Sequence, residues 1–402
     1  MIKKKLIRIT TVPISLDKLL GKQLSFMNQF YEVTAISADQ KELQRVAKKY
    51  GVKNYHVQMT RQISPLQDLL ALWKLYQFLR REKPQIVHTH TPKAGIVGMM
   101  AAFFAGVPHR FHTVAGLPLM EAEGLKRKIL NAVESLTYRF ATKVYPNSFG
   151  LQDIILKEGF CSPEKLKVLG KGSSNGIDTS HFNRDQISME KQEQLQLTLG
   201  IQPEDFVFIF VGRLVSDKGV NELVQAFKNI QRNGDAATPS PTHRLPHPAP
   251  HNLKLLLVGP KESDLDALLP ETLKEIEENT SIITAGYQDD VRPYFALAHA
   301  LAFPSYREGF PNVVLQAGAM ELPSIVSNIN GCNEIIKEGE NGLIIPVKNT
   351  SELQKAMRKL LTDEPLYDHL KKNARTRIVQ NYEQEVVWQA LLEEYRKAEK
   401  HV

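Results

Sequence analysis

Cysteine and long apolar runs are both scarce in this sequence of 402 residues. The two cysteines, Cys161 and Cys332, are too few for a disulfide framework, and their scarcity favours a reducing compartment. No apolar run reaches the roughly 18 residues that a membrane-spanning helix requires. Arg8 interrupts the chain before an apolar segment can develop behind the basic start, so no secretion signal is predicted. We therefore expect a cytoplasmic protein.

The sequence also lacks an even distribution of charge. Its net charge is +7, but residues 1–170 hold 26 Lys and Arg against 12 Asp and Glu, whereas the remainder holds 25 against 32. A basic first part indicates an anionic partner, either nucleic acid or an anionic membrane surface. The alternative is a solvated basic surface without a partner. No reader motif or interleaved aromatic pattern is present, so nucleic acid is not expected.

Short apolar or β-branched runs alternate with longer segments of helical periodicity. Between two such runs, for example, helical spacing is followed by Leu66, Leu69, Leu70, Trp73 and the pair Gln77-Phe78. This alternation predicts a parallel sheet with helices on both faces. The runs expected to form strands are 6–10, 32–37 and 85–89, followed by 206–212, 253–259, 300–304 and 324–327.

The alternation restarts after residues 171–176, a stretch rich in glycine and serine that is typical of a hinge. We therefore predict two doubly wound α/β domains, residues 1–172 and 173–382. Residues 233–252 lack periodicity and are rich in proline and histidine, so a disordered insertion is expected there. The terminal segment 383–402 is amphipathic and is predicted to dock back on the first domain.

Two cations follow the first strand expected in the second domain. That run ends in Gly212, after which a loop delivers Arg213 and Lys218. Ligands of α/β folds bind at the carboxyl ends of the strands. A planar guanidinium and an ammonium together suit a diphosphate. The alternative is a pair of surface cations that only cap a loop.

A second motif, Arg-Glu-Gly-Phe-Pro-Asn at 307–312, follows the run 300–304. It predicts a loop and then a helix that begins near Asn312, so that backbone N–H groups can face an anion. Glu308 would be out of place beside a phosphate, but it can accept hydrogen bonds from sugar hydroxyls. Gln316 lies on the same helix. The alternative role for Glu308 is a capping acid at the start of the helix.

In this order and separation, the two motifs resemble those of glycosyltransferase family 4, which has the GT-B fold. Segments 88–95, 175–178, 285–291 and 341–346 agree as well. The resemblance covers nearly the whole chain apart from 233–252. It implies two Rossmann-like domains facing across a cleft, with the acceptor bound by the first domain and a nucleotide sugar by the second.

The resemblance also implies roles for individual residues. Arg213 and Lys218 would neutralise the donor diphosphate, and Glu308 would bind hydroxyls of the donor sugar. Gln316 stands where the family has a glutamate that binds the ribose. The other donor-binding residues expected from these motifs are Gly212, Tyr287, Gly309, Phe310, Pro311 and Asn312.

The sequence departs from the family at a histidine of the first domain. The family places this residue just after a strand, near the sugar, and the corresponding position here holds Ala115. His112, three residues earlier, is a candidate catalytic residue. Strand alternation, however, directs its side chain to the face opposite that of Ala115. The alternative is a histidine packed at a strand edge.

The resemblance implies transfer with retention by front-face substitution, without a protein nucleophile or cofactor. No Asp-x-Asp motif stands where a metal site is expected, so we expect metal-independent transfer, with UDP as the commonest donor nucleotide. The basic first domain suits a polyprenyl-diphosphate-linked acceptor at the cytoplasmic face of the inner membrane, in capsule, O-antigen or exopolysaccharide assembly. The candidate contacts to anionic headgroups are Arg80, Arg81, Lys126, Arg127 and Lys128.

Two enzyme classes compete with this interpretation. Nucleotide-sugar 2-epimerases share the GT-B architecture, but they act on the donor alone and need acid and base groups beside the sugar. An NAD-dependent oxidoreductase would need a Gly-x-Gly-x-x-Gly motif after a first strand, which the sequence lacks. The Glu308 motif favours transfer over both.

Overall fold

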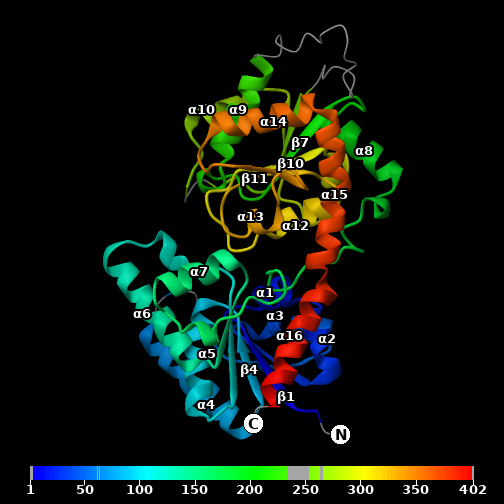
Figure 1. Ribbon diagram of the computed structural model, residues 1–402. Helices are drawn as coiled ribbons and strands as arrows, with labels where there is room; N and C mark the ends of the chain where they lie inside the picture. The colour runs from blue at the N-terminus through cyan, green and yellow to red at the C-terminus, as the bar shows by residue number, and fades with distance from the viewer. Residues whose placement is uncertain (1–2, 61, 63, 233–252, 263–265, 401–402) are drawn as a thin grey trace. The chain divides into compact units, whose positions relative to one another are not determined.

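The computed structural model describes residues 3–60, 62, 64–232, 253–262 and 266–400, so the predicted insertion 233–252 lies outside the described residues. The chain forms two compact units (Figure 1), Met1–Gly176 with Gln384–Val402, and Ile177–Glu383. The first division falls after Gly176 rather than after residue 172. One reason is that the amide of Ser173 donates to the carbonyl oxygen of Asn147 over 2.7 Å, which keeps this segment on the first unit.

Each unit is built on a six-stranded parallel sheet. The strand order is β3-β2-β1-β4-β5-β6 in the first unit and β12-β11-β10-β7-β8-β9 in the second. Both orders confirm the predicted doubly wound α/β class. The strands are β1 (Lys5–Ile9), β2 (Glu32–Ser37), β3 (Lys53–His56), β4 (Ile86–Thr89), β5 (His109–Val114), β6 (Lys143–Pro146), β7 (Phe206–Val211), β8 (Leu253–Val258), β9 (Ile282–Gly286), β10 (Ala300–Phe303), β11 (Ser324–Ser327) and β12 (Gly342–Ile345).

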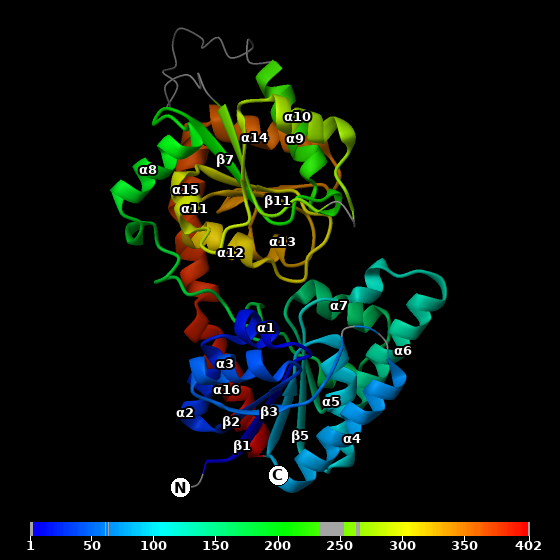
Figure 2. The same cartoon turned by 180° about the vertical axis from the view of Figure 1, so that it is seen from behind.

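Helices cover both faces of the first sheet (Figures 1 and 2). Alternation along β1 directs Ile7 and Ile9 to one face and Leu6 to the other. Ile7 and Ile9 belong to the core under α4 (Pro65–Glu82), α5 (Pro92–Phe104), α6 (Gly124–Phe140) and α7 (Phe149–Lys157). Leu6 belongs to the core under α2 (Gln23–Phe30), α3 (Gln40–Tyr50) and α16 (Gln384–Glu399).

The periodic residues of α4 form a helix as predicted, but of the apolar ones only Phe78 belongs to its buried face. That face consists of Ala71, Leu75, Phe78 and Leu79. Residues Leu66, Leu69, Leu70 and Trp73 are instead 80%, 62%, 62% and 56% exposed. The helix therefore carries a second apolar stripe that faces outward.

The C-terminal helix α16 is part of the first unit. Leu391, Leu392 and Tyr395 are buried in its core, and the hydroxyl of Tyr395 lies 2.6 Å from Nδ1 of His88 on β4. At the start of α16, Nε1 of Trp388 donates to Oδ1 of Asn175 over 2.7 Å. This bond joins the segment by which the chain leaves the first unit, before Gly176, to the segment by which it re-enters that unit, after Gln384.

A buried polar chain continues from Asn175 into the sheet. Gln23 Nε2 donates to Asn175 Oδ1 over 3.3 Å, and Gln23 Oε1 accepts from Nη2 of Arg8 over 2.6 Å. Arg8 is fully buried on β1, where burial lowers its pKa, and its Nε atom donates to Nε2 of His90. The connecting segment is thereby tied to the centre of the first sheet.

The second unit has a single core around β7, whose residues are buried on both faces as a central parallel strand requires. The strand order of this unit resembles that of the first unit, and helices cover both faces of its sheet. These helices are α8 (Met189–Leu199), α9 (Val220–Arg232), α10 (Pro270–Glu278), α11 (Arg292–Leu297), α12 (Asn312–Ala319), α13 (Cys332–Ile335), α14 (Thr350–Thr362) and α15 (Glu364–Tyr382).

Candidate functional site

The strand order of the second sheet reverses between its two central strands, β7 and β10. At such a reversal the connecting loops diverge, and ligands of doubly wound folds bind there, outside the carboxyl ends of the strands. Residues 212–219 leave β7 and residues 304–311 leave β10. Both predicted motifs therefore lie at the place where this fold binds ligands.

Backbone and side-chain contacts join these two loops. Gly219 has a φ of +71°, and a Cβ atom there would lie 2.1 Å from the carbonyl oxygen of Pro304, so only glycine fits. The amide of Tyr306 donates to the carbonyl oxygen of Asp217 over 2.9 Å. Arg307 Nη2 donates to the carboxylate of Asp217 over 2.8 Å. The loops therefore hold each other in place.

Lys218 and Glu308, which come from different motifs, are in direct contact. Lys218 Nζ lies 2.6 Å from Glu308 Oε1, and the two side chains are 16% and 18% exposed. The buried hydroxyl of Ser305 donates to the same carboxylate oxygen over 3.1 Å. Because partial burial limits screening by solvent and salt, this pair is stronger than one at the surface. A cation and a hydrogen-bond acceptor thus stand side by side.

Arg213 leaves the same strand but is bound elsewhere. Its Nη1 atom donates to Oε2 of Glu262, in the loop after β8, over 2.9 Å, and the two side chains are 45% and 38% exposed. Among the described residues, no hydrogen bond or ion pair joins Arg213 to Lys218 or Glu308. Two of the three predicted ionic residues are therefore in contact, and the third lies on the neighbouring loop.

The loops after β7 and β8 approach each other closely at Gly212 and Gly259, and this approach requires glycine at position 259. A Cβ atom on Gly259, whose φ is +145°, would lie 1.9 Å from the carbonyl oxygen of Gly212. The amide of Gly212 donates to the carbonyl oxygen of Val258 over 2.9 Å. This N–H is therefore not available to a ligand, and the role of Gly212 in donor binding stays a prediction.

The backbone at Glu308 is fixed from behind by the loop after β11. Asn330 Nδ2 donates to the carbonyl oxygens of Glu308 and Gly309. A Cβ atom on Gly331, at a φ of +76°, would lie 2.6 Å from the carbonyl oxygen of Gly309. Side chains following three strands, β7, β10 and β11, thus determine where the Glu308 carboxylate lies.

Phe310 and Pro311 are buried, and the ring of Phe310 packs against Tyr382 with centroids 5.5 Å apart. Their side chains therefore anchor the loop to the core and cannot line a ligand site. Any contribution from this segment comes from its backbone, and Pro311 has no N–H to donate. Asn312 is exposed and begins α12.

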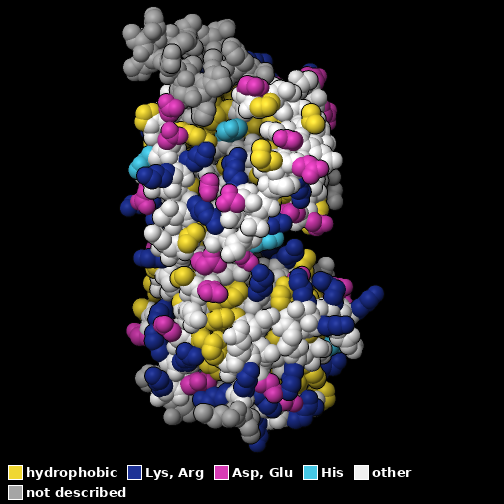
Figure 3. Space-filling model, turned by 90° about the vertical axis from the view of Figure 1, so that its right-hand side faces the viewer, with side chains coloured by type: hydrophobic (Ala, Val, Ile, Leu, Met, Phe, Trp, Pro, Cys, Tyr) yellow, Lys and Arg dark blue, Asp and Glu magenta, His cyan; other side chains and the backbone are white. Residues whose placement is uncertain are grey.

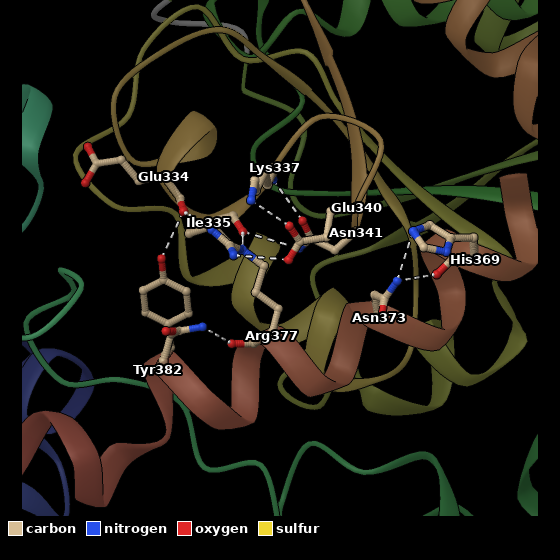
Figure 4. Close-up of polar contacts among 10 residues, drawn as sticks. Glu334, Ile335, Lys337, Glu340, Asn341, His369, Asn373, Arg377 and Tyr382 are labelled. Atoms are coloured by element: carbon tan, nitrogen blue, oxygen red, sulfur yellow. Dashed lines mark hydrogen bonds and ion pairs between the residues drawn. The ribbon is translucent and has the colours of Figure 1, made fainter.

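The helix α15 supports α13 (Figure 4). The helix α13 begins directly after Gly331, the residue that approaches Gly309. Arg377 Nε donates to the carbonyl oxygen of Ile335 over 2.8 Å, and the hydroxyl of Tyr382 donates to that of Glu334 over 3.0 Å. Asn341 is buried, and its amide donates to the carbonyl oxygen of Ile335 over 3.2 Å. The Asn341 motif noted in the sequence is therefore structural and stiffens the back of the site.

Gln316 and Tyr287 lie at the edges of this region. Gln316 lies one turn after Asn312, is half-buried, and has no side-chain hydrogen bond to the described residues. Tyr287 directly follows β9 and is 65% exposed. Its hydroxyl donates to Oδ1 of Asp289 over 3.1 Å, and this hydrogen bond raises the pKa of Tyr287.

His112 is buried on β5. It is 3% exposed, its Nδ1 atom lies 2.7 Å from Oγ1 of Thr89, and a Cβ atom on Gly95 would lie 2.6 Å from its ring. Burial lowers the pKa of His112 to about 4. This geometry corrects the candidate catalytic role, because a covered imidazole cannot contact a substrate. Ala115, at the position of the family's histidine, is exposed.

Two acidic residues that shape the site received no role from the sequence. Asp217 is buried and binds Arg307, and Oε1 of Glu222 accepts from the hydroxyl of Tyr306 over 2.6 Å. Burial and this hydrogen bond raise the pKa of Tyr306. Their proximity to Lys218 in the sequence was a usable signal, but only the fold reveals their partners.

Comparisons with known proteins agree with this geometry. Residues 25–172 match the family model described as glycosyl transferase 4-like domain, and residues 191–377 match that of glycosyl transferases group 1. The chain is 31% identical to the capsular polysaccharide biosynthesis glycosyltransferase CapM of Staphylococcus aureus, over 96% of each chain. It is 30% identical to the UDP-Gal:alpha-D-GlcNAc-diphosphoundecaprenol alpha-1,3-galactosyltransferase of Escherichia coli, over 81% of this chain and 78% of that protein.

The fold is likewise shared with a solved structure, that of Alr3699/HepE of Anabaena in complex with UDP and glucose. The TM-score is 0.78 at 19% identity, over 98% of this chain and 100% of that one. Neither sequence relative is an epimerase, so the epimerase alternative gains no support. With both family models matched in order and CapM similar along almost its whole length, this chain belongs to the GT-B glycosyltransferases of family 4.

Proposed function

We propose that the protein transfers a sugar from a UDP-sugar to a polyprenyl-diphosphate-linked saccharide, with retention of configuration. The observation that carries this proposal is the contact between Lys218 and Glu308 at the strand-order reversal of the second sheet. Support for the lipid-linked acceptor comes from the Escherichia coli relative, whose name specifies a diphosphoundecaprenol acceptor and a UDP-Gal donor. Capsule, O-antigen or exopolysaccharide assembly is the proposed setting, in line with CapM.

In the proposed reaction, the bond between the anomeric carbon and the diphosphate oxygen breaks while the acceptor hydroxyl bonds to the same face of that carbon. The proton of the hydroxyl passes to the departing phosphate oxygen. Lys218 and Arg213 stabilise the charge that develops on the leaving diphosphate. Glu308 accepts hydrogen bonds from hydroxyls of the sugar. No protein nucleophile and no metal ion enter this scheme.

The contact between Lys218 and Glu308 gives the donor a specific way to bind. A diphosphate near Lys218 competes with Glu308 for the ammonium group. Once Lys218 turns toward the phosphate, Glu308 Oε1 is available to a sugar hydroxyl, while Ser305 keeps the carboxylate in place. Donor binding therefore exchanges one internal ion pair for two contacts to the ligand.

The first unit is proposed to bind the acceptor at an anionic membrane surface. With its terminal helix included, this unit holds 30 Lys and Arg against 16 Asp and Glu. On the face drawn in Figure 3, basic side chains are interspersed with acidic ones, so the excess is not confined to one area of that face. No helix among the described residues is long and apolar enough to cross a bilayer.

Of the predicted headgroup contacts, Arg127 is the least suitable. Its Nη2 atom donates to Glu158 over 2.8 Å, and its Nη1 atom donates to the carbonyl oxygen of Leu119 over 2.6 Å. Lys126 and Lys128 on the same helix are exposed. We propose that these two lysines, together with Arg80 and Arg81, contact anionic headgroups on the cytoplasmic side.

The proposed activity is tested by incubating the full-length protein with a panel of nucleotide sugars and a polyprenyl-diphosphate-linked saccharide. Product mass should increase by one sugar with a UDP-sugar, and chelation of divalent metal should not lower the rate. Each donor incubated alone should keep its configuration at C2. Epimerised donor without any glycosylated product would contradict transfer and favour the epimerase alternative.

Gln316→Glu provides a separate prediction on the nucleotide. If the side chain at 316 binds the ribose, a carboxylate there forms stronger, charge-assisted hydrogen bonds than an amide does. We expect the Kd for UDP, measured by titration calorimetry, to fall by roughly three- to tenfold. Gln380→Glu, at an exposed position of α15, should leave the Kd unchanged. An unchanged or higher Kd for Gln316→Glu would remove Gln316 from the ribose site.

A further inference from the structure

Three helices of the first unit enclose an apolar groove. The helix α5 forms its floor, with α4 on one side and α6 on the other. Its volume is about 350 Å³, and residues from all three helices line it, including Leu72, Ile96, Met100, Ile129 and Val133. The groove has no counterpart in the predictions from sequence, because its walls come from separate segments of the chain.

The chemistry of the groove selects an uncharged hydrocarbon. The only charged groups among its lining residues are Asp68 and Lys93, and they form an ion pair with each other. The side chain of Lys93 is 11% exposed and that of Asp68 is 26% exposed. An anionic ligand would have to separate this pair, whereas an apolar chain leaves it intact and covers aliphatic side chains.

The rims of the groove are apolar as well. On α4 the outward stripe begins with Leu66 and Leu69, which are 80% and 62% exposed. On α6, Leu125 and Ile129 are 74% and 42% exposed. Leu69 and Ile129 also line the groove itself, so the exposed stripes and the groove form one continuous apolar surface. A continuous surface of this kind marks a binding site for an apolar partner.

One end of the groove lies at the carboxyl edge of the first sheet. Pro92 and Lys93, which line it, begin α5 three residues after the last residue of β4. The strand order of this sheet reverses between β1 and β4. The loops after those strands are joined at that point by the hydroxyls of Thr11 and Thr91, which are 2.7 Å apart. The groove therefore starts where a doubly wound unit binds its ligand.

We propose that this groove holds the isoprene units of the acceptor nearest to its diphosphate. The inference rests on the proposed lipid-linked acceptor and adds a site for the lipid itself. The volume is at the lower end of the range of about 300–1,000 Å³ for small-molecule sites, so the groove accommodates only the first part of a long chain. The sugar and diphosphate lie at the carboxyl edge, and the chain runs between α4 and α6 toward the exposed stripes.

The test compares two acceptors with the same sugar diphosphate, one carried on undecaprenol and one on a methyl group, in detergent. GlcNAc is the first head group to use, because the Escherichia coli relative is named for it. Val133→Trp and Ile96→Trp place an indole in the groove. We expect them to lower kcat/KM for the undecaprenyl acceptor by about tenfold or more, since each buried methylene contributes to binding. The methyl acceptor should react at the wild-type rate.

Ala132→Trp is the matched control, because Ala132 is the exposed neighbour of Val133 on α6 and does not line the groove. It should leave both acceptors unaffected, and thermal unfolding checks that all three variants fold. Equal losses with both acceptors, or no loss with undecaprenyl acceptor, would overturn the proposal. If the indoles have no effect but Trp73→Ser abolishes binding to anionic vesicles, this surface binds the bilayer and not the carrier chain. An inactive wild type with either acceptor would instead contradict the proposed function.

Discussion

Lys218→Met is expected to lower kcat by about 10²–10³-fold and to raise the Kd for UDP, because the ammonium group stabilises charge on the departing diphosphate. The corresponding change at Arg213 should have a smaller effect. Lys218 is 16% exposed and adjoins the predicted sugar-binding carboxylate, whereas Arg213 is 45% exposed and is bound to Glu262. Charge interactions weaken as solvent screening increases. Initial rates at saturating donor and calorimetric titration with UDP measure the two effects.

The control for this prediction is Lys261→Met. Lys261 lies on the loop after β8, its side chain is 55% exposed, and its ion pair with Glu277 is long, at 3.7 Å. Its loss should change kcat by less than about twofold. If Lys218→Met and Lys261→Met proved equally active, the diphosphate would not bind at the strand-order reversal, and the cation assignment would fail.

Glu308→Ala is expected to abolish measurable transfer while leaving UDP binding within a few-fold of the wild type. The carboxylate is assigned to the sugar and not to the nucleotide, so its removal should reduce affinity for the UDP-sugar and kcat but not affinity for UDP. Loss of a charged hydrogen bond costs about 1.5–3 kcal/mol for each sugar hydroxyl. Glu308→Gln retains the shape and one acceptor oxygen, and should keep more activity than the alanine variant.

Because the two residues are in contact, their substitutions should not be additive. Lys218→Met leaves Glu308 without its cation, and Glu308→Gln leaves Lys218 without its anion, so each single change carries part of the same cost. The double variant should lose less than the sum of the two changes in activation free energy. Glu352→Ala, on α14 in the second unit, where the side chain is 42% exposed, serves as a control away from these two loops. Wild-type turnover by Glu308→Ala, with the variant folded, would refute the assignment.

The sequence by itself determined the two sheets and the edge on which the ionic motifs lie. Alternating apolar and helical segments leave few topologies, and parallel strands place all their carboxyl ends on one edge. Lys218 and Glu308, which follow β7 and β10 and are 90 residues apart, could therefore be predicted to lie on the same edge of the second sheet. This placement follows from chain direction in a parallel sheet.

Periodicity was less informative about which face of a helix is buried. Leu66, Leu69, Leu70 and Trp73 have helical spacing, and α4 forms, but the core contains Ala71 and Leu75 instead. A helix with two apolar faces can pack on a sheet through either face. Which face of α4 is buried depends on α5, the helix that packs against α4. The outward stripe and the groove beside it are consequences of that choice.

Side-chain partners were decided by the tertiary structure alone. Arg213 binds Glu262, Asp217 binds Arg307, and His112 is covered by α5 at Gly95. Each of these contacts joins segments that are separated along the chain, and a hydrogen bond forms only where the backbone brings its two atoms within about 3 Å. Residue types and strand order establish which edge carries the chemistry, because chain direction fixes that edge. Which charges meet there depends on distances that no local pattern encodes.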